Sequence, residues 1–234
     1  MVLEVGLVGL KVKIVDDILR RFPELRILER EVKGIRVCEA DPGLEEFKEE
    51  VFANVRHRFT LEGLKDEPVF RAYRDFFWSI GVDPTKIRPA AEALTRRVLG
   101  GRPIPRINTA VDAYNLASMT TRVAFAAFDA SKLYGDVIMR FANTGEEFLG
   151  IGMNKPATLA GGEIVMADAS RLIAVYPHRD ADYSRITLQT KNLMLVSCGV
   201  PSMSLDQLKE AVDKASSLII RFCGGKSEPD RDRA

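Results

Sequence analysis

Apolar residues recur at helical spacing in several segments of the chain, and most of these segments are bounded by residues that start or end helices. Pro23 and Gly81 each end one of them, because proline disfavours a helical residue before it and glycine tolerates the turn that follows a helix. Ser204 opens another, with Gln207 three residues later in a capping-box pattern. The segments predicted to be helical are 14–22, a helix with apolar residues at 44, 47, 51 and 55, then 67–81, 88–99, 109–119 and 205–222.

Alternation of apolar and polar residues predicts the strands. The segments 25–31 and 32–37 form two strands, or one strand bent at Gly34. Helices and strands do not alternate regularly, so the pattern favours an α+β fold over a doubly wound parallel sheet. Further strands are predicted at 138–143, 164–168, 172–176 and 186–190, with turns between them that contain Gly, Pro and Asn.

The chain length of 234 residues fits one large domain or two small ones that share a core. We expect an N-terminal α/β segment over 1–65, packed on a main domain over 66–223. The remaining residues, 224–234, are polar and are expected to be a disordered tail.

Charge and composition exclude several classes of protein. Lys and Arg number 34 against 33 Asp and Glu, and this balance argues against a protein that coats DNA. No apolar run reaches the roughly 18 residues of a membrane span, and the start does not read as a signal peptide. Three widely spaced cysteines, two histidines and the absence of nucleotide-binding glycine motifs argue against a disulfide framework, a structural metal and a cofactor. We expect a cytoplasmic protein.

One stretch, residues 86–122, is locally basic, with seven Lys and Arg against two acidic residues in a chain of net charge +1. It is either a surface that contacts phosphates or a solvated helix with spare arginines. The candidate nucleic-acid contacts in and near it are Arg88, Arg97, Arg102 and Arg106.

A second polar cluster occupies residues 176–185, between two predicted strands. It contains His178, Arg179, Asp180 and Asp182. The cluster is either a solvated hairpin loop or a loop at the mouth of a pocket, where carboxylates hold an ammonium group and arginine pairs with phosphate or carboxylate. Ser184 would complete the residue types of a Ser-His-Asp triad, but side chains so close in sequence rarely converge on one substrate atom.

A third feature lies in the predicted helix 109–119. Asp112 and Asn115 are three residues apart and therefore share a helical face. They either make a cap or a hydrogen bond between elements, or they orient a substrate or a water molecule.

Short motifs that continue in order along the chain resemble the B3/B4 domain of the phenylalanyl-tRNA synthetase β chain. The resemblance runs from about Phe70 to Val200, and it makes the segment 66–223 a B3/B4-like core. The motifs are Arg102-Pro103, Ile107-Asn108, Val111-Asp112-x-x-Asn115, Phe128-Asp129, Gly145-Glu146, Gly162-Glu163, Asp168 and Thr190-x-Asn192.

The resemblance implies an α+β fold with an unusual β-sandwich, or mixed sheets, flanked by helices. It also implies hydrolysis of the ester between tyrosine and phenylalanine-specific tRNA. Asn115 matches the family's pocket asparagine and Thr190 its pocket threonine. Ala126 stands where the bacterial family has a histidine, and Ser170 where it has a glutamate that reads the tyrosine hydroxyl. Tyrosine specificity is therefore not expected to be retained.

We therefore expect a tRNA-binding protein that hydrolyses mischarged aminoacyl-tRNA in trans, assisted by a terminal ribose hydroxyl and without a cofactor or metal. Asn115 and Thr190 orient substrate or water, Asp180 or Asp182 holds the amine, and Arg179 meets phosphate. The other residues expected to border the substrate are Asp112, Ala126, Ser170 and His178. Two alternatives stay open: a non-catalytic module that binds tRNA or another RNA, and a pocket for a free amino-acid-like molecule.

Overall fold

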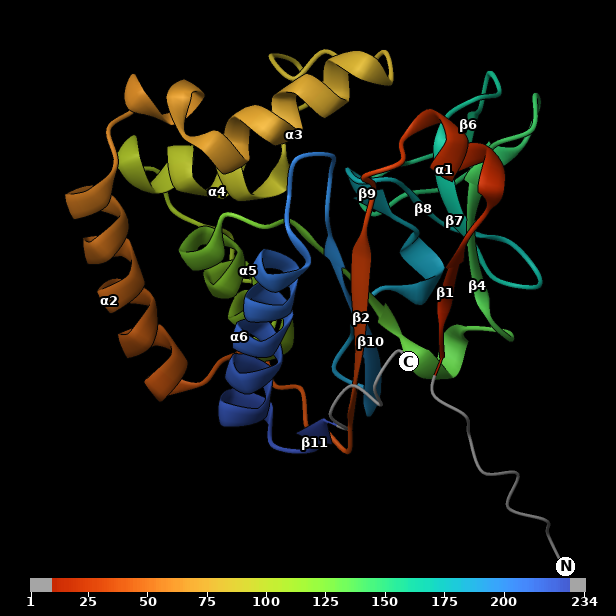
Figure 1. The fold of residues 1–234 in the computed structure, drawn as a ribbon. Helices are drawn as coiled ribbons and strands as arrows, with labels where there is room; N and C mark the ends of the chain where they lie inside the picture. Colours follow the sequence, from red (N-terminus) through yellow and green to blue (C-terminus); the bar gives the residue numbers. More distant parts are fainter. Residues whose placement is uncertain (1–9, 228–234) are drawn as a thin grey trace, which may run out of the picture.

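Two β-sheets stand side by side, and most of the helices lie on one side of them (Figure 1). The computed structural model describes residues 10–227. The mixture of separate helical and sheet regions is an α+β fold, as the sequence predicts. Within the described residues, no helix has the length and apolar character needed to cross a bilayer.

The first sheet has five strands in the order β1-β4-β7-β8-β9. Strand β1 runs parallel to β4, and the other neighbours are antiparallel. A short hairpin, Glu147–Phe148 (β5) with Ala157–Thr158 (β6), lies beside this sheet. The sheet strands are Val12–Ile14 (β1), Val137–Phe141 (β4), Ile164–Ala167 (β7), Leu172–Val175 (β8) and Arg179–Asp180 (β9).

The second sheet has four antiparallel strands in the order β11-β2-β10-β3. Its strands are Lys226–Ser227 (β11), Ile27–Lys33 (β2), Asn192–Cys198 (β10) and Phe125–Asp129 (β3). The N-terminal segment thus contributes a strand to each sheet. The predicted boundaries near residues 65 and 223 stay predictions.

The described residues form six α-helices, most of them on one side of the sheets, and α5 lies against α6 beside the second sheet (Figure 1). Local signals set several of their ends: the Asp41 side chain accepts a hydrogen bond from the Leu44 N–H, and both hydrogen bonds of the Ser204–Gln207 capping box are present. The helices are Asp16–Arg21 (α1), Pro42–Arg58 (α2), Pro68–Ser79 (α3), Ala90–Leu99 (α4), Thr109–Thr121 (α5) and Leu205–Cys223 (α6). Single turns of 3₁₀ helix occur at Gly63–Asp66 (η1), Ala130–Lys132 (η2) and Asp182–Ser184 (η3).

Several element predictions need correction. Ile14 ends β1 rather than beginning a helix, and α1 starts at Asp16. The predicted strand 186–190 is a turn, because the Thr190 hydroxyl accepts a hydrogen bond from the Thr187 N–H and the Thr190 N–H bonds back to the Thr187 carbonyl. Of the two alternatives for 25–37, two strands or one, the structure has one strand, which ends at Lys33 just before Gly34, whose φ of 70° is left-handed.

The polar tail is also partly ordered. Lys226 and Ser227 pair with β2 as β11, although disorder was predicted there. Residues 228–234, and the apolar start of the chain over 1–9, lie outside the described residues.

The fold brings an edge strand of each sheet together. Strand β3 has β10 on one side only, and its other edge faces β9 of the first sheet. The main apolar core fills the space between the sheets and the helices, while a smaller core with Phe148, Leu159 and Val175 lies under the β5–β6 hairpin. The junction of β3 and β9 lies between elements that are distant in sequence, and it positions the candidate site.

Candidate functional site

Asp180 lies at the junction of the two sheets. Its carboxylate Oδ2 accepts a hydrogen bond from the Ala127 N–H on the free edge of β3, at 3.2 Å. No described residue donates a hydrogen bond to its Oδ1, which leaves that oxygen available to a ligand. Beside Asp180 is a hollow of about 80 Å³, here called the inner pocket. Its wall is formed by β3, β7, β8, the 176–180 segment, the end of β10 and Ala90, and it includes Ala126, Met166, Tyr176 and His178.

Burial controls the ionisation of this region. It raises the pKa of the Asp180 carboxyl to about 7, against the opposing effect of the hydrogen bond from Ala127. Burial, and to a smaller extent the Asp180 carboxylate, also raise the pKa of the Tyr114 phenol and the Cys198 thiol. Asp180 therefore changes charge near neutral pH, and a bound ammonium group would favour its charged form.

His178 lines the inner pocket together with Asp180, and its imidazole is largely buried. Burial, together with the positive charge of Arg179, lowers its pKa to about 4, so the ring is neutral at pH 7. The ring contacts Phe77 edge-on, and its Nδ1 is buried without a hydrogen-bond partner among the described residues. A buried polar atom without a partner is costly, and a ligand group that pairs with it would recover that cost.

A larger hollow of about 780 Å³, here called the outer cavity, shares Val175, His178 and Arg179 with the inner pocket. Arg179 donates to the Ile151 carbonyl at 2.9 Å, and a Cβ atom on Gly150 would overlap with the Arg179 side chain. The remaining wall of the outer cavity combines apolar residues with one cation and one carboxylate. These residues are Arg21, Ile80, Val82, Phe148, Met153, Ala157, Leu159, Glu163 and glycines 81, 161 and 162.

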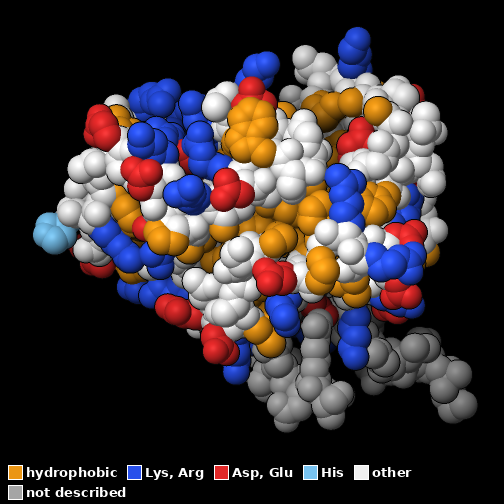
Figure 2. All heavy atoms as spheres, turned by 45° about the horizontal axis from the view of Figure 1, so that its top comes forward, with side chains coloured by type: hydrophobic (Ala, Val, Ile, Leu, Met, Phe, Trp, Pro, Cys, Tyr) orange, Lys and Arg blue, Asp and Glu red, His pale blue; other side chains and the backbone are white. Residues whose placement is uncertain are grey.

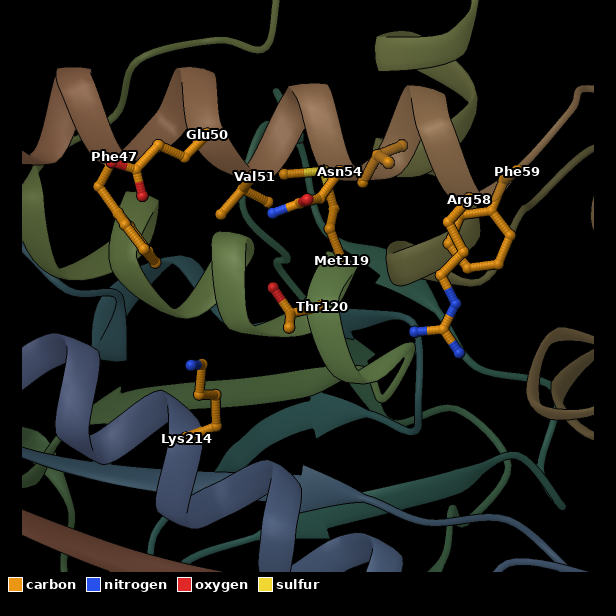
Figure 3. A pocket seen from close by; sticks show the side chains of 10 residues that line it. Phe47, Glu50, Val51, Asn54, Arg58, Phe59, Met119, Thr120 and Lys214 are labelled. Atoms are coloured by element: carbon orange, nitrogen blue, oxygen red, sulfur yellow. The ribbon is translucent and has the colours of Figure 1, made fainter.

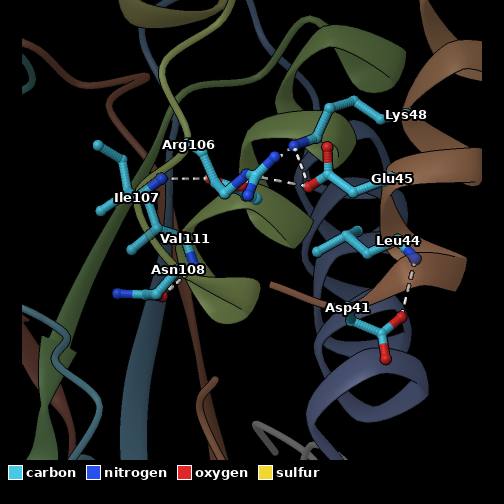
Figure 4. Close-up of polar contacts among 9 residues, drawn as sticks. Asp41, Leu44, Glu45, Lys48, Arg106, Ile107, Asn108 and Val111 are labelled. Carbon is cyan, nitrogen blue, oxygen red and sulfur yellow. Dashed lines mark hydrogen bonds and ion pairs between the residues drawn. The ribbon is translucent and has the colours of Figure 1, made fainter. Parts of the chain in front are cut away.

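The structure does not bring Asp112 to this site. Asp112 is 3% exposed and pairs with Lys48 of α2, with Nζ 3.1 Å from Oδ2. Its Oδ1 accepts a hydrogen bond from the Ile107 N–H at 3.1 Å. Figure 4 shows this network, in which Glu45 lies between Lys48 and Arg106. The carboxylate joins two helices and the loop before α5, which is a structural arrangement.

Thr190, Ser170 and Asp182 also lie outside the inner pocket. Thr190 is fully buried, and its hydroxyl donates to Asp129 Oδ2 at 2.7 Å. Ser170 is exposed in the turn between β7 and β8, where it bonds to Asp168. Asp182 begins η3 and forms an ion pair with Arg185. Only Asp180, His178, Arg179 and Ala126 of the predicted site residues meet in one place.

Asn115 is half-buried on α5, next to Tyr114. Its side chain lines neither the inner pocket nor the outer cavity and makes no hydrogen bond with a described residue. Its neighbour Tyr114 interacts with the site electrostatically: the pKa of its phenol is raised by burial and, to a smaller extent, by the charge of Asp180. Ala126 faces Val196 on β10, a fully buried apolar residue, so no second polar group stands opposite it in the sheet.

The predicted phosphate-contacting arginines differ in how strongly they are held. Arg88 and Arg102 are exposed and make no ion pair with a described residue. Arg97 donates twice to the Pro103 carbonyl, at 3.0 and 2.8 Å, and Arg106 lies 3.6 Å from Glu45. Figure 2 shows Lys and Arg side chains gathered on the left of the face it presents, over the helices, with apolar side chains along its middle.

Another hollow, of about 180 Å³, lies between α2 and α5 and has Lys214 of α6 on its border (Figure 3). None of the predicted site residues lines it. Among residues 10–227 there is no group of three or more His, Cys, Asp and Glu side chains placed to hold a metal ion.

Sequence reasoning missed Glu163 as a site residue, although it noted the Gly162-Glu163 motif. Glu163 borders the outer cavity; its Oε1 accepts from the Ala160 N–H at 2.9 Å, and its buried Oε2 has no partner among the described residues. A carboxylate after two adjacent glycines was the available signal, because glycines with positive φ let the chain turn tightly there.

The sequence and the fold can be compared with those of known proteins. The sequence matches the B3/4 domain family over residues 72–224. The phenylalanine–tRNA ligase beta subunit of Wolbachia sp. subsp. Brugia malayi (strain TRS) is 28% identical over 145 residues, which cover 52% of this chain and 18% of the relative. The same subunit from Yersinia pestis is 25% identical over 149 residues, 54% of this chain and 19% of the relative. The chain thus spans about a fifth of the length of these relatives.

A solved structure shares the fold. An N-terminal fragment of the phenylalanyl-tRNA synthetase beta-subunit from Pyrococcus horikoshii superposes with a TM-score of 0.50 at 13% identity, covering 94% of this chain and 50% of that one. The resemblance seen in the sequence motifs is confirmed, and the chain belongs to the B3/4 domain family.

Proposed function

We propose that this chain is a cytoplasmic protein that binds tRNA and hydrolyses the ester of mischarged aminoacyl-tRNA in trans. The observation that carries the proposal is the inner pocket, where Asp180 and His178 meet at the junction of two sheets in a B3/4 domain. Its relatives are subunits of a tRNA ligase, which supports tRNA as the partner.

Ester hydrolysis needs a positioned water, hydrogen-bond donors for the developing oxyanion and a group that holds the aminoacyl ammonium. Asp180 serves as the ammonium acceptor through Oδ1, since Oδ2 is bound by the Ala127 N–H. Arg179 lies at the shared wall of the two hollows and meets the negative charge of the terminal nucleotide.

The Asp180 carboxylate holds the ammonium group in this proposal, Ala126 is apolar, and the low pKa of His178 makes it a weak proton acceptor, so no side chain of the inner pocket is assigned as the general base. A ribose hydroxyl of the terminal nucleotide therefore relays the proton: it accepts the proton of the attacking water and passes its own proton to the departing ribose oxygen. Thr190 supports the turn before β10, and Arg88 and Arg102 contact phosphates farther along the tRNA.

A non-catalytic tRNA-binding module is the second candidate. The observation that favours it is the apolar pair Ala126 and Val196, which leaves no polar side chain at this position of β3 or opposite it on β10. Such a module would bind tRNA with an affinity that falls as salt increases, and would leave aminoacyl esters intact.

The test is a deacylation assay with a panel of correctly and incorrectly charged tRNAs. We expect the protein to hydrolyse at least one of them well above the spontaneous rate, and Asp180→Asn to lose most of this acceleration. Asp75→Asn, a change at an exposed position of α3, is the matched control and should keep full activity. Salt-dependent tRNA binding without any hydrolysis would select the non-catalytic module instead.

A further inference from the structure

The inner pocket is far smaller than the outer cavity that shares its wall, at about 80 against 780 Å³. An apolar cavity that holds benzene, with its six non-hydrogen atoms, measures about 150 Å³. The inner pocket therefore holds a group of about two to three non-hydrogen atoms. An aromatic ring does not fit unless the walls move.

The walls are held in place by packing and by a hydrogen bond. Met166 and Tyr176 are both almost completely buried. The Tyr176 hydroxyl donates to the Gly199 carbonyl, and its ring packs edge-on against Phe76 with centroids 6.3 Å apart. Forcing extra atoms into such a packed site costs roughly 10- to 100-fold in affinity.

The position of Asp180 determines how an aminoacyl group would enter the inner pocket. Asp180 accepts the ammonium group at the rim of the inner pocket, so the α-carbon also lies at the rim and only the side chain enters the pocket. The rest of the ester, with the terminal nucleotide, lies in the outer cavity, which is large enough for a drug-sized ligand.

We propose that the site accepts aminoacyl groups with side chains of about two non-hydrogen atoms at most, namely glycine, alanine and serine, and excludes aromatic ones. This inference rests on the proposed function, because it assumes that the inner pocket receives the aminoacyl group.

The test uses adenosine analogues that carry an aminoacyl group on a 3′-amino group through a stable amide bond. Calorimetry would compare the glycyl, alanyl, seryl, leucyl, phenylalanyl and tyrosyl compounds with the wild-type protein. We expect the three small analogues to bind at least about tenfold more tightly than the aromatic ones. Equal or tighter binding of the phenylalanyl or tyrosyl analogue, or no binding by any analogue, would overturn the proposal.

Two variants change the size of the pocket. Met166→Ala should raise the affinity for the leucyl analogue about tenfold. Met139→Ala is the matched control, because Met139 faces Met166 across β4 and β7, is equally buried and does not line the inner pocket. Ala126→Val fills the pocket and should weaken seryl binding by about tenfold, which keeps the proposal testable if Met166→Ala fails to fold. An unchanged order of affinities in a folded variant of either kind would refute the size limit.

Deacylation of the matching tRNAs separates this inference from the proposed function. Selective binding of small analogues without hydrolysis of seryl- or alanyl-tRNA would refute the hydrolysis and keep the size limit. Hydrolysis of tyrosyl- or phenylalanyl-tRNA at the same rate as the small esters would refute the size limit and keep the hydrolysis.

Discussion

Asp180→Asn should change how the stability of the protein depends on pH. The folded-state pKa of Asp180 is about 7, raised by burial, whereas an aspartate in an unfolded chain has a pKa of about 4. Between these values the folded state binds a proton that the unfolded state does not, so the free energy of unfolding falls as pH rises from about 4 to 7. Above that range the whole penalty for the buried charge is present.

The size of the effect follows from the two pKa values. Each unit of difference is worth about 1.4 kcal/mol, so the penalty is about 1 to 2 kcal/mol at pH 5 and about 4 kcal/mol at pH 8. Asparagine keeps an oxygen that accepts the hydrogen bond from the Ala127 N–H and carries no charge. The variant should therefore gain about 2 to 3 kcal/mol relative to wild type between pH 5 and pH 8.

Urea denaturation of both proteins at pH 5, 6, 7 and 8 measures this difference, and all other titrating groups cancel in the comparison. Asp75→Asn is the control, since its side chain is 72% exposed and should show a difference from wild type that does not depend on pH. A difference for Asp180→Asn that stays constant within about 0.5 kcal/mol from pH 5 to 8 would refute the reasoning about its burial.

Three further outcomes test other parts of the molecule. Arg102→Ala should lower the slope of log affinity for tRNA against log salt by about one, measured by filter binding, because one phosphate contact is lost; an unchanged slope would place the RNA surface elsewhere. Asn115→Ala should leave the rate of deacylation near that of wild type, because the Asn115 side chain lines neither hollow; a loss of about 30- to 1000-fold with an unchanged melting temperature would instead place the amide at the ester. Lys48→Ala should lower the free energy of unfolding by about 3 to 5 kcal/mol, because it leaves the Asp112 carboxylate buried without its cation, whereas the exposed Lys86→Ala should change it little.

Local signals in the sequence were enough to predict most helices. The capping box at Ser204 and the acceptor at Asp41 act within a few residues of each helix start, so they can be read directly. The segment 186–190 alternates like a strand, but the Thr190 hydroxyl bonds to the Thr187 backbone and closes a turn. Side-chain hydrogen bonds of this kind compete with strand pairing, and alternation alone does not reveal them.

The site was predictable only in part. The polar segment 176–185 marked Asp180 and His178 as candidates because so many polar groups are unusual between two strands. The strand that Asp180 contacts could not be predicted, because Ala127, whose N–H donates to its carboxylate, lies 53 residues earlier in the sequence. The same limit explains Thr190 and Asp112, whose residue types suit a substrate pocket but whose partners, Asp129 and Lys48, come from distant elements that fold next to them.

The surroundings of Asp180 indicate a functional reason for a carboxylate, rather than an amide, at this position. The hydrogen bond that the Asp180 carboxylate accepts from the Ala127 N–H needs only an acceptor oxygen, which asparagine would supply without a charge. A carboxylate at this junction instead costs about 4 kcal/mol at neutral and higher pH, a large share of the 5 to 15 kcal/mol by which domains are stable. Destabilising groups of this kind concentrate at functional sites, where the charge has a use that outweighs its cost. A bound ammonium group is such a use, because it favours the charged form that burial disfavours.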